Sequence, residues 1–127
     1  MRGFLLLRAK KMTNAVTALP ITSKASAALV TNLIAIPAAA KVYGIYGYNS
    51  KAGAQFIQLH DSATLPADTA VPVFNMTVPA TSNFSIDFGF HGMDFVNGVV
   101  VCNSSTAPTK TIGSADCQFF VRLTPNY

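Results

Sequence analysis

The stretch Asn83–Gly89, with the sequence NFSIDFG, carries the clearest structural signal in this chain. Its three apolar residues, Phe84, Ile86 and Phe88, alternate with a serine and an aspartate. Because successive side chains of a β-strand point to opposite faces, this alternation predicts an antiparallel strand with one buried face and one solvated face. Cys117–Leu123 repeats the alternation and predicts a second strand of the same kind.

Four further runs also predict strands, although their alternation is less strict. They are rich in β-branched and aromatic residues, and turn-forming residues separate them. The runs are Lys41–Tyr48, Gln55–Asp61, Val71–Val78 and Phe95–Asn103. The links expected as turns or loops are Asn49–Gly53, Ser62–Ala70, Pro79–Ser82 and Ser104–Asp116. This spacing predicts an all-β fold, a single antiparallel β-sandwich that is jelly-roll-like and has about 7–8 strands.

The Ala-rich segment Ser23–Ala40 has two interpretations. Its alanines favour a helix, whereas Thr31, Asn32 and the β-branched residues around them favour two short strands. We expect strands, and we place the β-sandwich domain at residues 23–127. Residues 1–22 are expected to form a basic N-terminal extension outside that domain.

Charge is scarce in this chain and is concentrated at its beginning. The chain has nine Lys and Arg residues, five Asp and no Glu, and four of the nine bases lie in the first eleven residues. From Met12 onward, five bases and five acids cancel. Charged residues make up 11% of the chain, against about a quarter in an ordinary soluble domain. Because a neutral, weakly charged surface tends to associate, we expect this domain to work inside an assembly.

The basic N-terminal segment also has two interpretations. Its apolar run, Phe4–Leu7, is shorter than the roughly 7–15 residues of a signal-peptide core, and no stretch reaches the roughly 20 apolar residues of a bilayer span. We therefore expect neither export by that route nor a membrane partner. The segment is either a loose terminus or an arm that holds a neighbouring subunit. In the second case the interface candidates are Arg2, Arg8, Lys10 and Lys11.

Residues suited to catalysis or metal binding are few. The two histidines, His60 and His91, each have an aspartate nearby, Asp61 and Asp94. These four residues would build an acid–base or metal site if the fold brought them together, but their spacing is not diagnostic. The chain has no Glu and no GxSxG, P-loop or GxGxxG motif. We therefore expect no enzymatic activity, no cofactor and no metal.

Two other features leave alternatives open. Cys102 and Cys117 are too few for a disulfide scaffold, and they are either two buried thiols or one cross-strand disulfide. Tyr43, Tyr46 and Tyr48 form an aromatic group that either packs in the core or at a subunit interface, or stacks on sugars or bases. Tyr46 and Tyr48 are added to the interface candidates. Nucleic acid is not an expected partner, because the region after residue 11 has no basic stripe.

Three long stretches combine these strand and turn signals in a recognisable order. They are KVYGIYGYNSKAGAQFIQLHDS (Lys41–Ser62), TLPADTAVPVFNMTVPA (Thr64–Ala80) and FSIDFGFHGMDFVNGVVVCNSS (Phe84–Ser105). From Ser23 to Leu123 the chain resembles a widespread type of small β-sandwich protein encoded among the structural genes of tailed bacteriophages. The likeness rests on strand and turn residues, so it carries over no functional residue.

The resemblance implies a non-enzymatic virion component, a capsid decoration or cement protein that binds the outer shell and stabilises capsomer contacts. Its expected partners are the major capsid protein or another virion protein, and further copies of itself, with a trimer favoured. Its expected location is the virion, assembled in the host cytoplasm. Alternative roles are a tail or head–tail component, or a virion-attached glycan- or receptor-binding module. A small hydrolase or lyase built around His60 and His91 is a third alternative, and it requires these histidines to converge.

Overall fold

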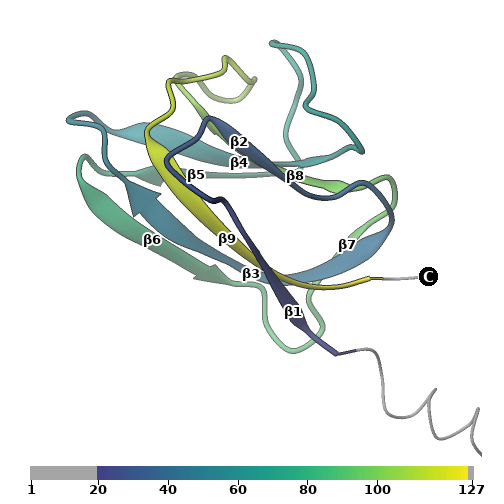
Figure 1. The fold of residues 1–127 in the computed structure, drawn as a ribbon. Helices are drawn as coiled ribbons and strands as arrows, with labels where there is room; N and C mark the ends of the chain where they lie inside the picture. Colours follow the sequence, from purple (N-terminus) through teal and green to yellow (C-terminus); the bar gives the residue numbers. More distant parts are fainter. Residues whose placement is uncertain (1–19, 126–127) are drawn as a thin grey trace, which may run out of the picture.

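The computed structural model describes residues 20–125, and within this range the regular structure consists of nine β-strands (Figure 1). The strands are β1 (Thr22–Ala25), β2 (Asn32–Ile36), β3 (Ala40–Asn49), β4 (Gln55–Asp61), β5 (Phe74–Val78), β6 (Ser82–Asp87), β7 (Met93–Phe95), β8 (Val99–Ser104) and β9 (Cys117–Pro125). Residues 20–125 contain no helix of the length and apolarity that crossing a membrane requires.

The strands form two antiparallel sheets that face each other as a sandwich. Sheet A has the order β1-β9-β3-β6, with β7 also pairing with β3, and sheet B has the order β2-β8-β4-β5. The pairs are nested along the chain, since β1 pairs with β9, β2 with β8, β3 with β6 and β4 with β5. This is the strand order of a jelly roll, and it confirms the expected fold class.

The hydrophobic core lies between the two sheets. In β9, Phe119, Val121 and Leu123 are fully buried, and they alternate with more exposed residues as the sequence predicts. Phe84 from β6 is 5% exposed, and its ring centroid lies 6.1 Å from that of Phe119. The remaining buried core residues come from both sheets: Ala35, Ala40, Val42, Ile45, Ile57, Leu59, Val78, Phe95, Val99, Val101 and Cys117.

The Ala-rich segment forms strands, as expected. Its first part is β1, which pairs with β9, and its second part is β2, which pairs with β8. The helical alternative for this segment is therefore wrong. The extension expected at residues 1–22 lies mostly outside the described residues, so the boundary at residue 23 stays a prediction.

Most predicted strands agree with the observed ones to within two residues at each end, but two differ by more. The strand expected at Val71–Val78 begins only at Phe74, because Pro72 belongs to the preceding loop. The strand expected at Phe95–Asn103 is divided into β7 and β8 by a turn at residues 96–98.

Asp61, at the end of β4, holds that turn in place. Its Oδ1 accepts hydrogen bonds from the backbone N–H of Val96 at 3.1 Å, of Asn97 at 2.8 Å and of Gly98 at 3.4 Å. A Cβ on Gly98 would collide with the Ser62 carbonyl oxygen and would lie 2.9 Å from the Ile36 carbonyl oxygen. Backbone segments approach closely here, and this requires a residue without a side chain.

A buried polar cluster closes the other end of the core. Gln55 Nε2 donates to Asn49 Oδ1 at 2.6 Å and to Cys117 Sγ at 3.1 Å, and Asn103 Nδ2 donates to Gln55 Oε1 at 3.2 Å. Asn49 also donates to the Gly53 and Pro79 carbonyls, and Asn103 donates to the Ser114 carbonyl. The cluster thereby joins the β3–β4, β5–β6 and β8–β9 connections.

Candidate subunit-contact surfaces

The central part of the outer face of sheet A is built from β6, β3 and β9, and β1 extends the face beyond β9. The strand register places its outward-pointing residues in three rows that cross these strands. We call these nine positions the sheet A face. The rows are Asp87–Gly44–Arg122, Ser85–Tyr46–Phe120 and Asn83–Tyr48–Gln118.

Aromatic side chains occupy two of the three rows. Phe120 is 37% exposed, Tyr48 is 36% exposed and Tyr46 is half-buried. A Cβ on Gly44 would collide with the Tyr46 hydroxyl, so the Tyr46 ring lies along the backbone of this glycine. Aromatic side chains are enriched at protein interfaces, because they bury a large area and still offer a polar group. The structure thus brings the two sequence candidates, Tyr46 and Tyr48, together with Phe120.

The sheet A face carries one base and one acid, on opposite sides of Gly44. These are Arg122 on β9 and Asp87 on β6, and both are exposed. Within residues 20–125 neither of them takes part in a salt bridge. Farther along the same sheet, Lys41 Nζ and Asp94 Oδ1 pair with each other at 3.1 Å. The face is therefore neutral in sum, and it offers two opposite charges to a second molecule.

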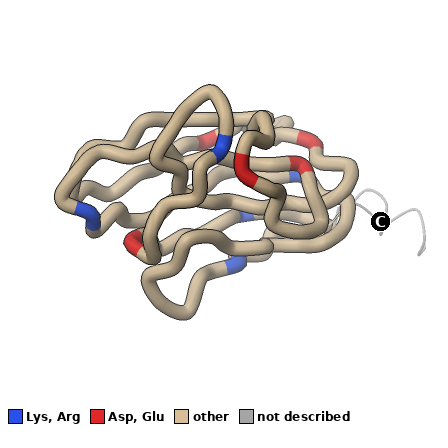
Figure 2. The backbone as a smooth tube through the Cα atoms, turned by 90° about the horizontal axis from the view of Figure 1, so that it is seen from above, with Lys and Arg blue, Asp and Glu red and all other residues tan. Residues whose placement is uncertain are grey.

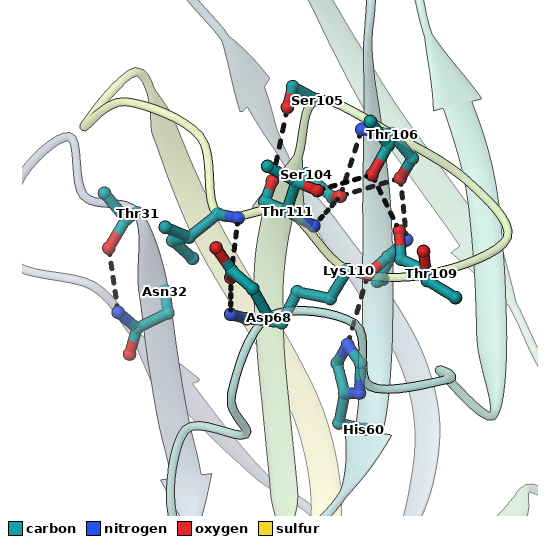
Figure 3. A network of polar contacts seen from close by, with 12 residues as sticks. Thr31, Asn32, His60, Asp68, Ser104, Ser105, Thr106, Thr109, Lys110 and Thr111 are labelled. Atoms are coloured by element: carbon teal, nitrogen blue, oxygen red, sulfur yellow. Dashed lines mark hydrogen bonds and ion pairs between the residues drawn. The ribbon is translucent and has the colours of Figure 1, made fainter.

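On the outer face of sheet B, in contrast, the central strands β8 and β4 are covered by the segments 62–73 and 105–116, which meet at Asp68 and Lys110 (Figure 3). Outward-pointing residues of the edge strands, such as Ile34 of β2 and Thr77 of β5, stay exposed. The two segments are joined by an ion pair of 2.7 Å between Lys110 Nζ and Asp68 Oδ1. The Thr69 N–H also donates to the Lys110 carbonyl. The Lys110 side chain is only 2% exposed. The Lys110 ammonium and the Ile112 N–H lower the pKa of the Asp68 carboxyl below its ordinary value.

A second buried layer lies beneath these segments. Val100 and Cys102 of β8 and Gln58 of β4 are fully buried, although they point away from the core between the sheets. The Gln58 amide donates to the Thr106 carbonyl of the covering segment. His60 is 2% exposed, and its Nε2 lies 3.2 Å from Gln58 Oε1. Burial and the nearby Lys110 charge lower the pKa of His60.

The structure does not bring the two histidines into one site. His60 lies under the segments that cover sheet B, whereas the His91 ring packs against Phe90 in the β6–β7 connection, with ring centroids 5.3 Å apart. The His91 carbonyl accepts a hydrogen bond from Lys41 of sheet A. Residues 20–125 contain no group of three or more His, Cys, Asp or Glu side chains that could hold a metal ion. The convergence that the hydrolase or lyase alternative requires is absent here.

The two cysteines are free thiols. Cys102 belongs to β8 and lies on the outer side of sheet B, whereas Cys117 belongs to β9 and faces the core. The disulfide alternative is therefore wrong. Burial raises the pKa of each thiol to about 11, so neither is a reactive nucleophile at neutral pH.

Figure 2 shows the positions of the charged residues dispersed along the backbone of the described part of the chain. Five bases and five aspartates lie between residues 20 and 125, and they do not gather on one face. The remaining interface candidates, Arg2, Arg8, Lys10 and Lys11, lie outside the described residues. Their role stays a prediction.

Sequence reasoning missed Phe120, Arg122 and Asp87 as members of one surface. One signal for Phe120 was present, because it is a large apolar residue on the otherwise polar side of an alternating strand. Gln118 and Arg122 mark that side as the outer one. No local sequence signal shows that Asp87 of β6 shares a face with β9. The two strands lie on one face only because each of them pairs with β3.

Comparison with known proteins gives one structural likeness and no family. No protein-family model matches this sequence, and no curated protein matches it. The structure is similar to that of the coat protein of Tobacco streak virus, with a TM-score of 0.46 and 9% sequence identity. The similar region covers 85% of this chain and 88% of that chain. At this identity and score, no functional residue and no activity is transferred.

Proposed function

We propose that this chain is a non-enzymatic structural protein of a virus particle, and that it works in many copies. The observation that carries the proposal is the uncovered sheet A face, which combines three exposed or half-buried aromatic residues with a neutral charge sum. Jelly-roll domains serve in viral capsids, as well as in lectins and cupins. A shell subunit must bury surface against its neighbours, and the sheet A face is suited to that task.

The low charge of the domain supports the same proposal. A free domain with no net charge tends to associate, whereas a subunit of an assembly covers its weakly charged surface with neighbours. Exposed apolar side chains also lie outside the sheet A face, with Phe90 91% exposed and Val96 74% exposed. Phe90 and Val96 lie in the connections on either side of β7, so they offer further contacts to a shell.

More specifically, we propose a decoration or cement protein of a tailed bacteriophage capsid. It would bind the major capsid protein on the outer shell as a homo-oligomer, with a trimer favoured, and would be located in the virion after assembly in the host cytoplasm. Several weak contacts per oligomer would together give strong attachment through avidity. The outer edges of β1, β2, β5 and β6 have no strand partner within residues 20–125, so they could pair with a strand of the capsid protein.

A second candidate function is a virion-attached module that binds glycans, or a component of the tail or of the head–tail junction. The aromatic side chains of Tyr46, Tyr48 and Phe120 favour the glycan alternative, because exposed aromatic rings stack on sugars. In that case the sheet A face would hold an oligosaccharide instead of a protein neighbour.

The test compares particles assembled with and without the full chain. We expect purified particles to contain the chain at a copy number that matches the capsid lattice, as measured by quantitative mass spectrometry. Particles without the chain should release their nucleic acid at a lower temperature in a dye-accessibility assay. A copy number that matches a tail symmetry would favour the alternative, and absence of the chain from particles would refute both roles.

A further inference from the structure

We propose that two copies of this chain stack their sheet A faces on each other, related by a two-fold axis that runs parallel to β3. This inference rests on the proposed function, because it names the contact by which copies of the structural subunit meet. The partner is a second copy of the same chain. Two observations support this pairing: the register of β6, β3 and β9, and the positions of the two charges on the face.

The register makes the face complementary to itself under this symmetry. Gly44 pairs with Asp87 on one side and with Arg122 on the other, so the two charges lie one strand away from β3 in opposite directions. A rotation by 180° about an axis along β3 keeps the position along the strand and exchanges the two sides. Arg122 of each copy therefore lies over Asp87 of the other copy, and the contact contains two such charge pairs.

A two-fold axis perpendicular to the strands, also in the plane of the face, does not have this property. An axis perpendicular to the strands through the Tyr46 row would place Arg122 over Gln118 and Asp87 over Asn83. Both charges would then meet neutral amide side chains and would lose water without gaining an opposite charge. Charge complementarity thus selects the axis along β3.

The apolar residues fit the same arrangement. Tyr46 and Tyr48 lie on β3 and meet the same residues of the second copy near the axis, while Phe120 lies over Ser85. Stacked sheets are about 10 Å apart, a spacing that a long arginine and a short aspartate together span. Sheet B offers no comparable continuous surface, because the segments 62–73 and 105–116 cover its central strands β8 and β4 and leave exposed side chains only on the edge strands β2 and β5.

The proposal is tested by a charge exchange in the full chain. A two-fold contact joins copies in pairs, so the trimer of the proposed function would form through a different surface. We expect sedimentation equilibrium to show a concentration-dependent association of the native protein into dimers, or into hexamers where that trimer also forms. The variants Arg122→Asp and Asp87→Arg each place like charges against each other twice per contact, and should raise Kd on the order of 100-fold. The double variant R122D/D87R restores opposite charges, so it should associate nearly as the native protein does. Lys51→Asp, the same charge change in the β3–β4 turn, is the matched control and should leave Kd unchanged.

Cysteine cross-linking tests the two-fold symmetry directly, and it also tests the proposal where a charge variant does not fold. Tyr48 lies near the axis, so Tyr48→Cys should be cross-linked to its own copy by a short bis-maleimide. Thr77→Cys, exposed on sheet B, should not be cross-linked.

Single charge variants that bind as the native protein, or a double variant that is not rescued, would overturn the stacking. If R122D nevertheless entered particles at the normal copy number, the proposed function would stand without this contact. A native chain that stays monomeric and is absent from particles would refute both.

Discussion

Replacing Gln55 by leucine tests whether the buried polar cluster stabilises the end of the sandwich. Gln55 is 2% exposed and links Asn49, Cys117 and Asn103. Leucine has a similar size but cannot form hydrogen bonds. The two strong links, to Asn49 and Asn103, would be lost with little change in packed volume.

The expected loss of stability depends on which hydrogen bonds Asn49 and Asn103 keep in the variant. Asn49 Oδ1 still accepts the Lys51 N–H at 3.0 Å, so it stays satisfied. Asn103 Nδ2 still donates to the Ser114 carbonyl at 2.7 Å, but its second N–H loses its acceptor, and its Oδ1 already has no hydrogen-bond partner. An orphaned buried polar group costs about 1–3 kcal/mol, and the added apolar burial offsets part of the lost hydrogen bond to Asn49. We expect a net loss of about 2 kcal/mol in the free energy of unfolding, or roughly 6–10 °C in Tm.

The assay is urea unfolding followed by tyrosine fluorescence and circular dichroism, since the chain has no tryptophan. The m-value should stay constant while the midpoint falls. Gln118→Leu, the same substitution on the outer side of β9, is the control and should change stability by less than about 0.5 kcal/mol at dilutions where the chain is monomeric. A Gln55→Leu variant as stable as the native protein would refute the stabilising role of the cluster.

Three further predictions concern other parts of the molecule. Burial and Lys110 lower the pKa of His60, so the folded state binds a proton less readily than the unfolded state does. The free energy of unfolding should therefore fall as the pH decreases from about 6.5 toward the lower pKa of the folded state. The variant His60→Gln should remove this pH dependence, whereas His91→Gln should keep it. Thermal unfolding between pH 7.5 and 5 measures the effect. Gly98→Ala forces a Cβ against two backbone carbonyls and should cost more than about 2 kcal/mol in urea unfolding, whereas Gly53→Ala, which meets open space, should be nearly neutral. The two buried thiols should react with Ellman's reagent at pH 8 only on unfolding, and rapid labelling of the native protein would contradict the buried placement.

The strands and the core could be predicted because their signals are local. The alternation around Phe84 and Phe119 reports which face is buried, and both residues lie in the core between the sheets. The division between β7 and β8 was not predictable in this way. It depends on the Asp61 carboxylate, which lies more than thirty residues earlier in the chain and accepts the N–H groups of the turn.

The contact surface could be predicted only in part, for the same physical reason. Tyr46 and Tyr48 are close in sequence, so their grouping was visible. The neighbours Phe120 and Asp87 join them through strand pairing over long sequence separations, and a single sequence carries no direct signal for that register. The Lys110–Asp68 pair over sheet B is likewise a contact between two loops. From the sequence alone, Lys110 and Asp68 could each be recognised only as a polar residue of a loop.

We propose that this jelly roll is a virion subunit that meets its neighbours through the sheet A face. The decisive experiment is an image of the intact particle at side-chain resolution. We predict that it shows the chain repeated on the shell, with Tyr46, Phe120 and Arg122 buried against a neighbouring chain. A particle that lacks the chain, or one in which these residues face solvent in every copy, would show that this face is not the subunit contact.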